Sequence, residues 1–587
     1  MSVWSPSRAF ASLLIRQQER RLQRFLNQTR QAAALQQEVL FSKIRKCASS
    51  QFGQEHGFSA IRNIDDFRRQ LPIVEYDYYS PYIQRVARGE VGAMFPEGEQ
   101  IIMFTLTSGT TGEPKLIPVT KTWLNEFKAS WNLWGLKVFV DHPSGILRKI
   151  VSIVGNWDMR RTESNIPCGL ASGLSTRHQH PFVRRYYSIP PSVFSIKDAT
   201  SRYYTMLRLT LPEDVGLFVT STPATVIRFA QLGDQFREQL IRDIANGSLS
   251  QDIDISADMR RRLRKRISVA NPRRAAELER IVQRTGHLYP KDYWNLSQVA
   301  CWLGGTVAGN VHQIPDYFGD TARRDIGLIS SEGRHTVPLD DNRPEGVLAF
   351  NHHYYEFIPA GEIHSQHPTI LECHELEVGQ KYFILMTTSS GLYRYNINDL
   401  VQCNGYVGQA PIIEFLHKGD RIADMEGEKI SERHIVNAVT DASQRIGIAL
   451  ESFTAIPIRP SNEPPYYALI VESKDVNNQQ RAHGLLRGFD EWLKKHVAIY
   501  QTKREDEYLG PPRLIRITDG SWSRYRQSEI ERRRVGEEQY KHPCLALDGH
   551  FIEHFQTIDT VCMSSGTKQV PMPHLPTQTG MVHNALV

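Results

Sequence analysis

The sequence lacks the long apolar segments that membrane and secreted proteins require. No stretch of its 587 residues approaches the roughly 18 uninterrupted apolar residues of a membrane-spanning helix. The apolar run at 9–15 is too short for the core of a signal peptide, and the polar run 16–21 follows it at once. We therefore expect neither a membrane protein nor a secreted one.

Cysteines are few, and their spacing suggests no pairs. Seven cysteines are an odd number, and no two of them have CxxC spacing, so neither a disulfide framework nor a structural zinc site is indicated. A reducing compartment is the simpler interpretation, and we expect a cytoplasmic protein. The cysteines are Cys47, Cys168, Cys301, Cys373, Cys403, Cys544 and Cys562.

A strong excess of one charge is also missing. Lysine and arginine number 70 against 64 aspartates and glutamates, and a net charge of +6 gives no reason to expect nucleic acid or a membrane surface. Basic residues concentrate only at 260–284, where no aromatic residue precedes Tyr289 to stack on bases. A solvated helix face is the favoured interpretation, and nucleic-acid binding is the least favoured function.

The overall composition is that of an ordinary globular protein. Hydrophobic residues make up 40% and charged residues 23%, so the chain can bury several cores. At about 150 residues per domain the length suggests roughly four domains, or fewer if one is large. The sequence shows no internal repeat.

Between about 100 and 420, apolar runs alternate with helical patterns. This alternation favours an α/β fold with a large N-terminal domain of mostly parallel sheets. An amphipathic helix over about 10–46 precedes it and is expected to lie across this domain. Buried strands are expected at 101–106, 149–154, 216–220 and 346–350, and helices at 223–246 and 256–284.

After about residue 420 the pattern changes. Short strand-like runs and two amphipathic helices indicate a small, mobile α+β domain, and the last residues are rich in Pro, Thr, Gln and Gly without periodicity. We predict three parts: a large domain at 1–420, a small domain at 421–550 and a flexible tail at 551–587.

The strongest chemical signal is the segment from Phe104 to Lys115, FTLTSGTTGEPK. Its glycines let successive N–H groups face one point, its hydroxyls add donors, and Lys115 adds a positive charge, which together favour phosphate binding. The spacing is not that of a Walker loop. A plain surface turn is the alternative. The candidate loop residues are Thr107, Ser108, Gly109, Thr110, Thr111 and Gly112.

This segment resembles the first signature of the adenylate-forming superfamily of acyl-CoA synthetases, peptide-synthetase adenylation domains and luciferases. The rest is most similar to its Gretchen Hagen branch, the auxin-responsive acyl-acid amido synthetases. The resemblance covers about 45–550 and rests on five ordered motifs.

Two further motifs imply walls of a nucleotide site. Trp302–Asn310 resembles the loop that borders the nucleotide and acyl pocket, here through Gly304 and Gly305, although alone it would be a glycine turn. In ISSEG, at 329–333, the resemblance assigns Ser331 to cofactor binding and Glu332 to Mg²⁺, which prefers carboxylate oxygen. Leu328 stands where the family has a tyrosine.

The fourth motif, Ser390–Val401, resembles Gly-Leu-Tyr-Arg-Tyr-Arg-x-Gly-Asp-Val. The resemblance implies that Asp399 accepts hydrogen bonds from the ribose hydroxyls. Asn396 and Asn398 replace the usual arginine and glycine, so the turn before Asp399 is expected to differ. Without the resemblance, this segment would be predicted as an edge strand.

The last motifs implicate the small domain. Residues 415–432 resemble the interdomain hinge, with Asp420 as candidate pivot. Lys429 could approach the nucleotide, or pair with Glu426 or Glu432, and both alternatives stay open. Gln539–Pro543 resembles Gln-Tyr-Lys-x-Pro, which makes Lys541 the mobile lysine that neutralises the reacting phosphate. Taken alone, Lys541 would be one of many surface lysines. Cys544 replaces the arginine that usually follows the proline.

The resemblance implies a two-step ligase that uses ATP and Mg²⁺. A carboxylic acid would be activated as acyl-adenylate and then transferred to the amine of an amino acid. Coenzyme A as the acceptor, or a nucleotide-binding module with decayed catalysis, are the alternatives. The sequence specifies neither the acid, nor the amine, nor the oligomeric state.

Overall fold

The computed structural model of the chain describes most residues between 19 and 563. The described ranges are 19–106, 115–363, 365–419, 422–423, 425–426, 428–460, 463–506, 508–533 and 540–563. The phosphate-loop candidates Thr107–Gly112, the candidate pivot Asp420 and residues 564–587 lie outside them.

The predicted parallel sheet is present. Its four strands pair only in parallel in the order β3-β6-β7-β8, and helices α9–α13 pack around it in one hydrophobic cluster. Alternation of buried strands and helices predicted this arrangement, which confirms the α/β class. The elements are β3 (Lys149–Ser152), β6 (Val215–Val219), β7 (Gln298–Ala300), β8 (Arg323–Arg324), α9 (Ala199–Thr210), α10 (Pro223–Gln235), α11 (Arg237–Asn246), α12 (Ala257–Ile267) and α13 (Pro272–Thr285).

The largest sheet, however, is antiparallel. Seven strands follow the order β11-β12-β17-β16-β15-β13-β14, and every pairing between neighbours is antiparallel. The segment 390–401, which without the resemblance would be an edge strand, leads into an internal one, because β16 pairs with β15 on one side and β17 on the other. The strands are β11 (Thr336–Val337), β12 (Gly346–Leu348), β13 (Tyr354–Pro359), β14 (Leu371–Glu372), β15 (Lys381–Thr387), β16 (Tyr395–Val407) and β17 (Ala410–Lys418).

A third sheet carries the start of the candidate phosphate loop. Strand β1 (Ile101–Leu106) pairs antiparallel with β2 (Leu116–Thr120) and parallel with β5 (Pro167–Gly169), whose other neighbour is β4 (Arg160–Arg161). Helix α6 (Lys121–Asp141) follows β2 directly, capped by the Thr120 hydroxyl, which accepts from the Trp123 amide. Residues 107–114 therefore connect two adjacent strands at one sheet edge.

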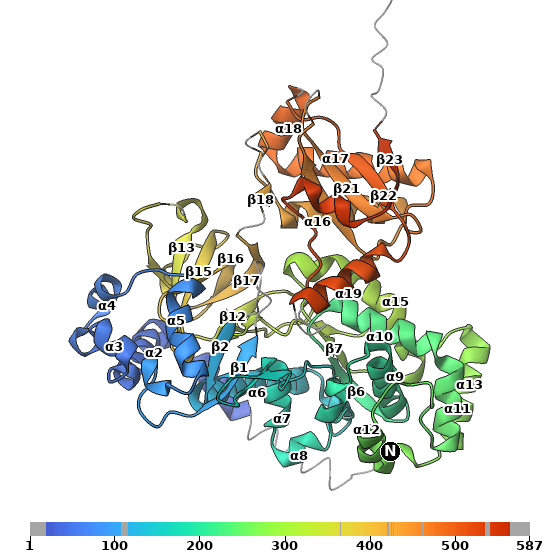
Figure 1. Ribbon diagram of the computed structural model, residues 1–587, viewed down its shortest axis with the longest axis horizontal. Coiled ribbons are helices and arrows are strands. Elements are labelled where there is room, and N and C mark those ends of the chain that lie inside the picture. The colour runs from blue at the N-terminus through green and yellow to red at the C-terminus, as the bar shows by residue number, and fades with distance from the viewer. Residues whose placement is uncertain are drawn as a thin grey trace, which may run out of the picture.

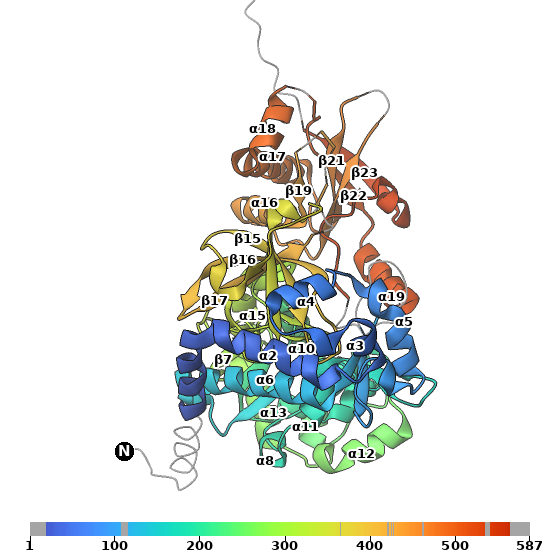
Figure 2. The same cartoon turned by 90° about the vertical axis from the view of Figure 1, so that its left-hand side faces the viewer.

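The N-terminal segment lies across this region. Residues 19–28 are helical, a 3₁₀ turn interrupts them at η1 (Thr29–Gln31), and α2 (Ala32–Cys47) continues. Figure 2 shows α2 running beside α6, where Lys43 Nζ lies 2.8 Å from Glu126 Oε1. The helices that follow α2 are α3 (Gln51–Glu55), α4 (Ile64–Gln70) and α5 (Tyr76–Ala87).

The C-terminal part forms its own sheet and core, which Figure 1 shows as the orange and red ribbon above the rest. Its order is β20-β21-β22-β23, with α16 and α17 packed together on it. The elements are α16 (Glu432–Ile446), β20 (Phe453–Ile458), β21 (Tyr466–Glu472), α17 (Gln479–His496), α18 (Ala498–Glu505), β22 (Arg513–Ile517), α19 (Ser521–Arg533) and β23 (Thr557–Cys562).

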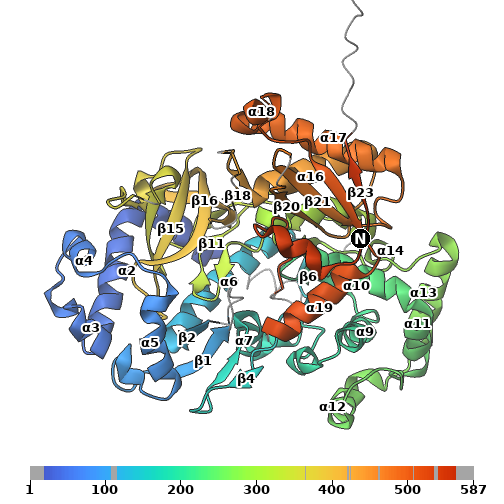
Figure 3. The same ribbon diagram turned by 45° about the horizontal axis from the view of Figure 1, so that its top comes forward.

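The C-terminal boundary of this part differs from the predicted one. Strand β23 pairs antiparallel with β22 and completes the sheet, so the prediction of a flexible tail from residue 551 is wrong for 551–562. Helix α19 begins on this sheet, where Trp522 joins one of its hydrophobic clusters, and Figures 1 and 3 show its red ribbon extending toward the N-terminal part. The last strand was missed because a run of Thr, Asp and Gln residues weakens its apolar alternation.

The arginines of the basic segment 260–284 partly serve the fold. Arg260 donates to the carbonyls of Leu249 and Ile253, and Arg266 donates to that of Ser188. None of the helices within the described ranges combines the length and the apolar character needed to cross a membrane.

Candidate active site

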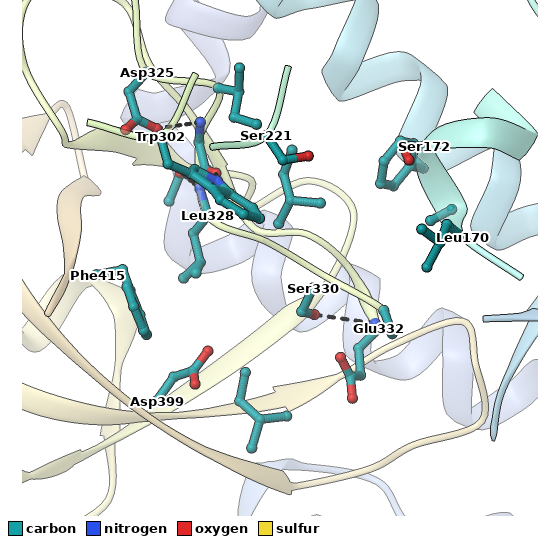
Figure 4. A pocket seen from close by; sticks show the side chains of 18 of the residues that line it. Leu170, Ser172, Ser221, Trp302, Asp325, Leu328, Ser330, Glu332, Asp399 and Phe415 are labelled. Carbon is teal, nitrogen blue, oxygen red and sulfur yellow. Dashed lines mark hydrogen bonds between the residues drawn. The ribbon is translucent and has the colours of Figure 1, made fainter. Parts of the chain in front are cut away.

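A cavity of about 360 Å³ lies where the three sheets of the large region meet. Side chains from segments more than 400 residues apart in the sequence line it. Six of the predicted site residues are among them: Lys115, Gly304, Ser331, Glu332, Asp399 and Lys541. Figure 4 shows Asp399 and Phe415 on one side of this space and Leu170 and Ser172 on the other.

Lys115 lines the cavity at the C-terminal end of the predicted phosphate loop. It directly precedes β2, and its ammonium lies 5.2 Å from the centroid of the Tyr76 ring. Leu106, the last residue of β1, also lines the cavity, so both described ends of the candidate phosphate loop reach it. The loop residues themselves remain a prediction.

Glu332 contributes a buried carboxylate from the turn between β9 (Ile329–Ser330) and β10 (Gly333–Arg334). Its amide donates to Ser330 Oγ at 3.2 Å, and its carbonyl accepts from Trp123 Nε1 at 2.6 Å. Burial raises the pKa of the Glu332 carboxyl, while the Ser330 hydroxyl and the positive charge of Lys418 oppose that rise. The backbone of this turn is therefore fixed on both sides.

Ser331 joins this turn to the phosphate side. Its hydroxyl donates to the Leu106 carbonyl at 3.3 Å, and its own carbonyl accepts from Thr105 Oγ1 at 3.1 Å. Glu332 is thus held next to the end of β1. A single carboxylate in this position fits Mg²⁺, which usually takes one or two protein carboxylates and completes its shell with phosphate oxygens and water.

Asp399 and Lys418 form a pair across strands β16 and β17. Lys418 Nζ donates to Asp399 Oδ1 at 2.6 Å and to the Ile397 carbonyl at 2.6 Å. The residue before Asp399 carries the backbone strain: Asn398 has φ of +59°, in the left-handed region where glycine and asparagine are tolerated best. Asparagine in place of the family's glycine therefore keeps the backbone turn that a glycine would allow.

Trp302 and Phe415 place two flat aromatic surfaces in the cavity wall. The Trp302 indole is oriented by its Nε1–H, which donates to the Gly327 carbonyl at 2.8 Å. Gly304 lines the cavity and Gly305 follows it with φ of +64°; a Cβ atom on Gly305 would come within 2.8 Å of the Phe415 ring. Leu328, at the family's tyrosine position, lines the cavity as an aliphatic side chain.

Lys541 reaches the cavity from the C-terminal part. Its ammonium lies 5.2 Å from the centroid of the Trp302 ring. The following residues are bound to β20: Thr454 Oγ1 donates to the Pro543 carbonyl at 2.7 Å, and the Ala455 amide donates to the Cys544 carbonyl at 2.8 Å. The Cys544 amide in turn donates to Glu432 Oε1 at 2.8 Å. These three hydrogen bonds support the segment where the family has an arginine.

The two parts of the chain also contact each other next to the cavity. Helix α16 packs on η6 (Gly305–Gln313), the helical turn that follows the glycine pair. Arg433 Nη2, at the start of α16, lies 3.2 Å from Glu414 Oε1 on β17. Lys541 is therefore held over the site by a packed interface.

The opposite end of the cavity is apolar with several hydroxyls. Phe127 and Trp131 of α6, Leu170 and Val154 supply the apolar surface. Hydroxyl groups come from Ser152, Ser172, Ser175, Thr176, Thr220 and Ser221. Such a mixed surface fits a small acyl group that carries polar substituents.

Three predicted residues lack support as parts of this site. Lys429 is exposed and does not line the cavity, and its φ of +48° marks a strained turn. Gly305 does not line the cavity but leaves room for the Phe415 ring, which does. Asp420 lies outside the described residues. Sequence reasoning missed Lys418, although it stands inside the fifth motif, and it missed Asp325 and Trp131, which no motif marks.

Asp325 is a buried carboxyl in the wall of the cavity. Its oxygens accept from the amides of Leu303 and Gly327, both at 2.6 Å. Burial raises the pKa of Asp325 to about 7, against the effect of these two hydrogen bonds. The carboxyl therefore orders the two loops that carry Trp302 and Leu328.

With this geometry in place, comparison with known proteins decides the family. Residues 21–322 match the GH3 family N-terminal domain, 346–418 the GH3 family central domain and 433–550 the GH3 family C-terminal domain. The chain belongs to the GH3 family. The acyl-acid amido synthetases to which its motifs point form this family, and the matches extend over all three of its domains.

Relatives and solved structures agree with this assignment. The probable indole-3-acetic acid-amido synthetase GH3.11 of Oryza sativa subsp. japonica is 27% identical over 493 residues, which cover 76% of this chain and 79% of the relative. The jasmonoyl-L-amino acid synthetase JAR6 of Nicotiana attenuata is 22% identical over 78% of this chain and 81% of its own length.

Among solved structures, a GH3.15 acyl acid amido synthetase matches with a TM-score of 0.79 at 20% identity, covering 96% of this chain and 99% of that one. A 2-hydroxyisobutyryl-CoA ligase matches with a TM-score of 0.51 at 11% identity over 89% of this chain and 90% of that one. The fold is therefore that of the GH3 enzymes, and more distantly that of an acyl-CoA ligase.

Proposed function

We propose that this protein is an ATP-dependent acyl-acid amido synthetase. In the first half-reaction a carboxylate oxygen of a small acid attacks the α-phosphorus of ATP, and pyrophosphate leaves with the electrons of the broken P–O bond. In the second, the neutral amine of an amino acid attacks the acyl carbon, loses a proton, and AMP leaves. The observation that carries the proposal is the convergence of Lys115, Glu332, Asp399 and Lys541 on one cavity.

Each of these residues has a separate task in the proposed reaction. Lys115 and Lys541 oppose the negative charge that builds up on the phosphate chain during the first attack. Asp399, held by Lys418, accepts hydrogen bonds from the ribose hydroxyls. When bound at Glu332, Mg²⁺ would neutralise phosphate charge. The loop residues 107–112 would add backbone and hydroxyl donors.

The chemistry requires no nucleophile from the protein. A free carboxylate resists attack by an amine because it is charged and has no good leaving group, and adenylation supplies that leaving group. The remaining task is to bring the amine to the acyl carbon at the right angle while water is kept out. The packed contacts of α16 on η6 and of Lys541 on Trp302 would close the cavity during the first half-reaction.

We further infer that the C-terminal part changes its orientation between the two half-reactions. Lys541 lies over the nucleotide side of the cavity, where it would obstruct the path of the incoming amine. Asp420 is the proposed pivot, and the proposed domains are 1–420 and a small domain that begins at 421. In this mechanism Lys541 belongs to adenylation alone.

Coenzyme A is the second candidate acceptor, because the distant fold likeness is to an acyl-CoA ligase. A single experiment separates the possibilities. ATP–pyrophosphate exchange is measured across a panel of carboxylic acids, and the active acid is then incubated with ATP and either the twenty amino acids or coenzyme A. An amide product supports the proposal, a thioester supports the alternative, and ATP binding without exchange for any acid leaves a nucleotide-binding module.

A further inference from the structure

Arg334 is a fully buried cation for which the described part of the chain offers no hydrogen-bonding partner. It lies in β10, two residues after Glu332, and none of its side chain is exposed to solvent. Its atoms Nε, Nη1 and Nη2 are all buried, and none of them meets an acceptor among the described residues. Five N–H donors are therefore left without a partner.

Two other buried arginines have carboxylate partners. Arg324, equally buried, contacts Asp141 and Asp341 at 2.7 Å each. Arg394 contacts Glu356 at 2.8 Å and donates to the Leu71 carbonyl at 2.9 Å. Burying a cation without a counter-charge is costly, and a native structure keeps such a group only for a reason.

The guanidinium lies against the floor of the cavity. Its carbon Cζ is 4.9 Å from the centroid of the Trp131 ring and 5.7 Å from that of Trp134. A Cβ atom on the preceding residue, Gly333, would come within 2.5 Å of His353, so Gly333 faces the protein interior. Side chains alternate along a strand, and Arg334 therefore points the opposite way, toward α6. Trp131, half-buried, lines the cavity.

Charge at Arg334 persists at neutral pH. Burial lowers the pKa of Arg334 to about 9, and the negative charge of Asp325 opposes this decrease. The two oxygens of Asp325 already accept backbone hydrogen bonds from Leu303 and Gly327, so Asp325 acts on Arg334 from a distance. One side chain behind the cavity wall there is thus a positive charge that lies over two tryptophan rings and has no hydrogen-bonded carboxylate among the described residues.

We propose that the acid activated in this cavity is a dicarboxylic acid, whose second carboxylate pairs with Arg334 when the Trp131 ring turns aside. This inference rests on the proposed function and specifies its substrate. The reacting carboxylate has to lie beside Lys115 and Lys541, which line the cavity, and Arg334 does not line it. A planar guanidinium with all its donors available matches a carboxylate in a bidentate pair.

The test compares matched substrates. ATP–pyrophosphate exchange is measured for α,ω-dicarboxylic acids of four to eight carbons and for benzene dicarboxylic acids, each beside its monomethyl ester, which keeps one reacting carboxylate. We expect the native protein to prefer a diacid over its monoester by about tenfold or more in kcat/KM, the effect of one charge-assisted pair. In Arg334→Met this ratio should fall to about one, and Arg334→Lys should recover part of it. Lys121→Met, which removes an exposed charge from α6, should leave the ratio unchanged.

Stability and direct binding provide independent measurements. Arg334→Met replaces a buried cation by an apolar residue of similar volume. Its Tm should therefore equal or exceed that of the native protein. Calorimetric titration of the diacid should show binding to the native protein and weakened binding to Arg334→Met, even if no acid supports exchange and the proposed function fails. A native protein that treats diacids and monoesters alike, or an Arg334→Met variant that keeps the preference or merely loses Tm, would overturn the proposal.

Discussion

The ammonium of Lys418 lies 2.6 Å from Asp399 Oδ1, and the two residues stand directly opposite each other on neighbouring antiparallel strands. The Asp399 side chain is 7% exposed and that of Lys418 is 47% exposed, so the pair has one end in the cavity wall and one end in solvent. Lys418 also donates to the Ile397 carbonyl, which fixes its position along β16. The lysine therefore orients the carboxylate proposed to bind ribose.

This pair gives the first prediction. Lys418→Met should raise the KM for ATP about three- to tenfold, because the partner charge is half exposed and worth little in itself. Asp399→Ala should impair ATP use more severely, since the ribose contact itself is lost. Exchange kinetics at varied ATP concentration measure both, and Lys418→Arg serves as the charge-retaining control. A larger loss in Lys418→Met than in Asp399→Ala would contradict the assigned order of roles.

Mg²⁺ dependence should separate the two cavity carboxylates. Asp399→Ala should impair ATP use at every Mg²⁺ concentration, because its proposed partner is the sugar. Glu332→Gln, which keeps the shape of the side chain and weakens metal binding, should recover part of its activity as Mg²⁺ is raised. Titrations of Mg²⁺ with both variants decide this, and identical responses would show that the division of roles is wrong.

Lys115 is expected to contribute directly to ATP use. Loss of one charge-assisted contact to phosphate costs on the order of 1.5–3 kcal/mol. Lys115→Ala should therefore lower adenylation or ATP affinity about tenfold or more. Lys121→Ala, six residues away and exposed, is the matched control for a general loss of positive charge. Unchanged exchange kinetics in Lys115→Ala would argue against phosphate binding at this end of β2.

Lys541 should matter in one half-reaction only. Lys541→Ala is expected to slow acyl-adenylate formation severely and to leave amide formation from pre-made acyl-adenylate much less affected, because its charge is needed when pyrophosphate leaves. Single-turnover measurements of each half-reaction provide the comparison. Equal losses in both would make Lys541 a structural residue and would remove the reason for domain movement.

Buried histidines should make the large region sensitive to acid. Burial lowers the pKa of His335 to about 3, and its ring nitrogens contact Ser330 and Tyr355. The unfolded chain binds this proton near pH 6.5 and the folded chain does not, so stability should fall as the pH decreases from about 6.5 toward 4. At pH 5 this group alone should cost about 2 kcal/mol.

Urea unfolding at pH 7 and pH 5 measures that cost. The native protein should lose stability between these two values, and His335→Gln, which cannot take up a proton, should lose about 2 kcal/mol less. Tyr355→Phe, which removes a hydroxyl contact without a titrating group, is the control. The same pH-dependent loss in His335→Gln and the native protein would assign acid sensitivity to other groups.

From the sequence, the residues that line the cavity were easier to predict than the sheet in which some of them lie. Strands β1, β3 and β6 were predicted because each is a short apolar run, and a buried strand needs no other pattern. The antiparallel sheet around β16 was not predicted, although a two-residue turn at Gly408–Gln409 joins β16 to β17 and has the glycine-first pattern of a hairpin. β16 lies inside the sheet because β15 pairs with its other side, a contact that the sequence of the segment does not reveal.

Some of the residues that line the cavity could be predicted from the sequence, and others could not. Lys115, Glu332 and Asp399 stand in local motifs, so the resemblance assigned them to one site, and all three line the cavity. Asp325 and Trp131 come from segments with no motif, and only the folded chain brings them to the cavity. Arg334 is a further case: in sequence it is an arginine after a glycine, and its burial without a partner depends on α6, about 200 residues away.

The hydrogen bonds between residues 543–544 and β20 have a consequence for the proposed movement of the C-terminal part. Pro543 and Cys544 are hydrogen-bonded to Thr454 and Ala455 of β20. Lys541, two residues before Pro543, would therefore move together with the C-terminal sheet. Rotation of that sheet would withdraw the ammonium from Trp302 without any change in the side chain's own torsion angles. In the proposed mechanism, the charge that serves adenylation and the segment that covers the cavity then move together, so the amine would reach the acyl carbon only after that charge has been withdrawn.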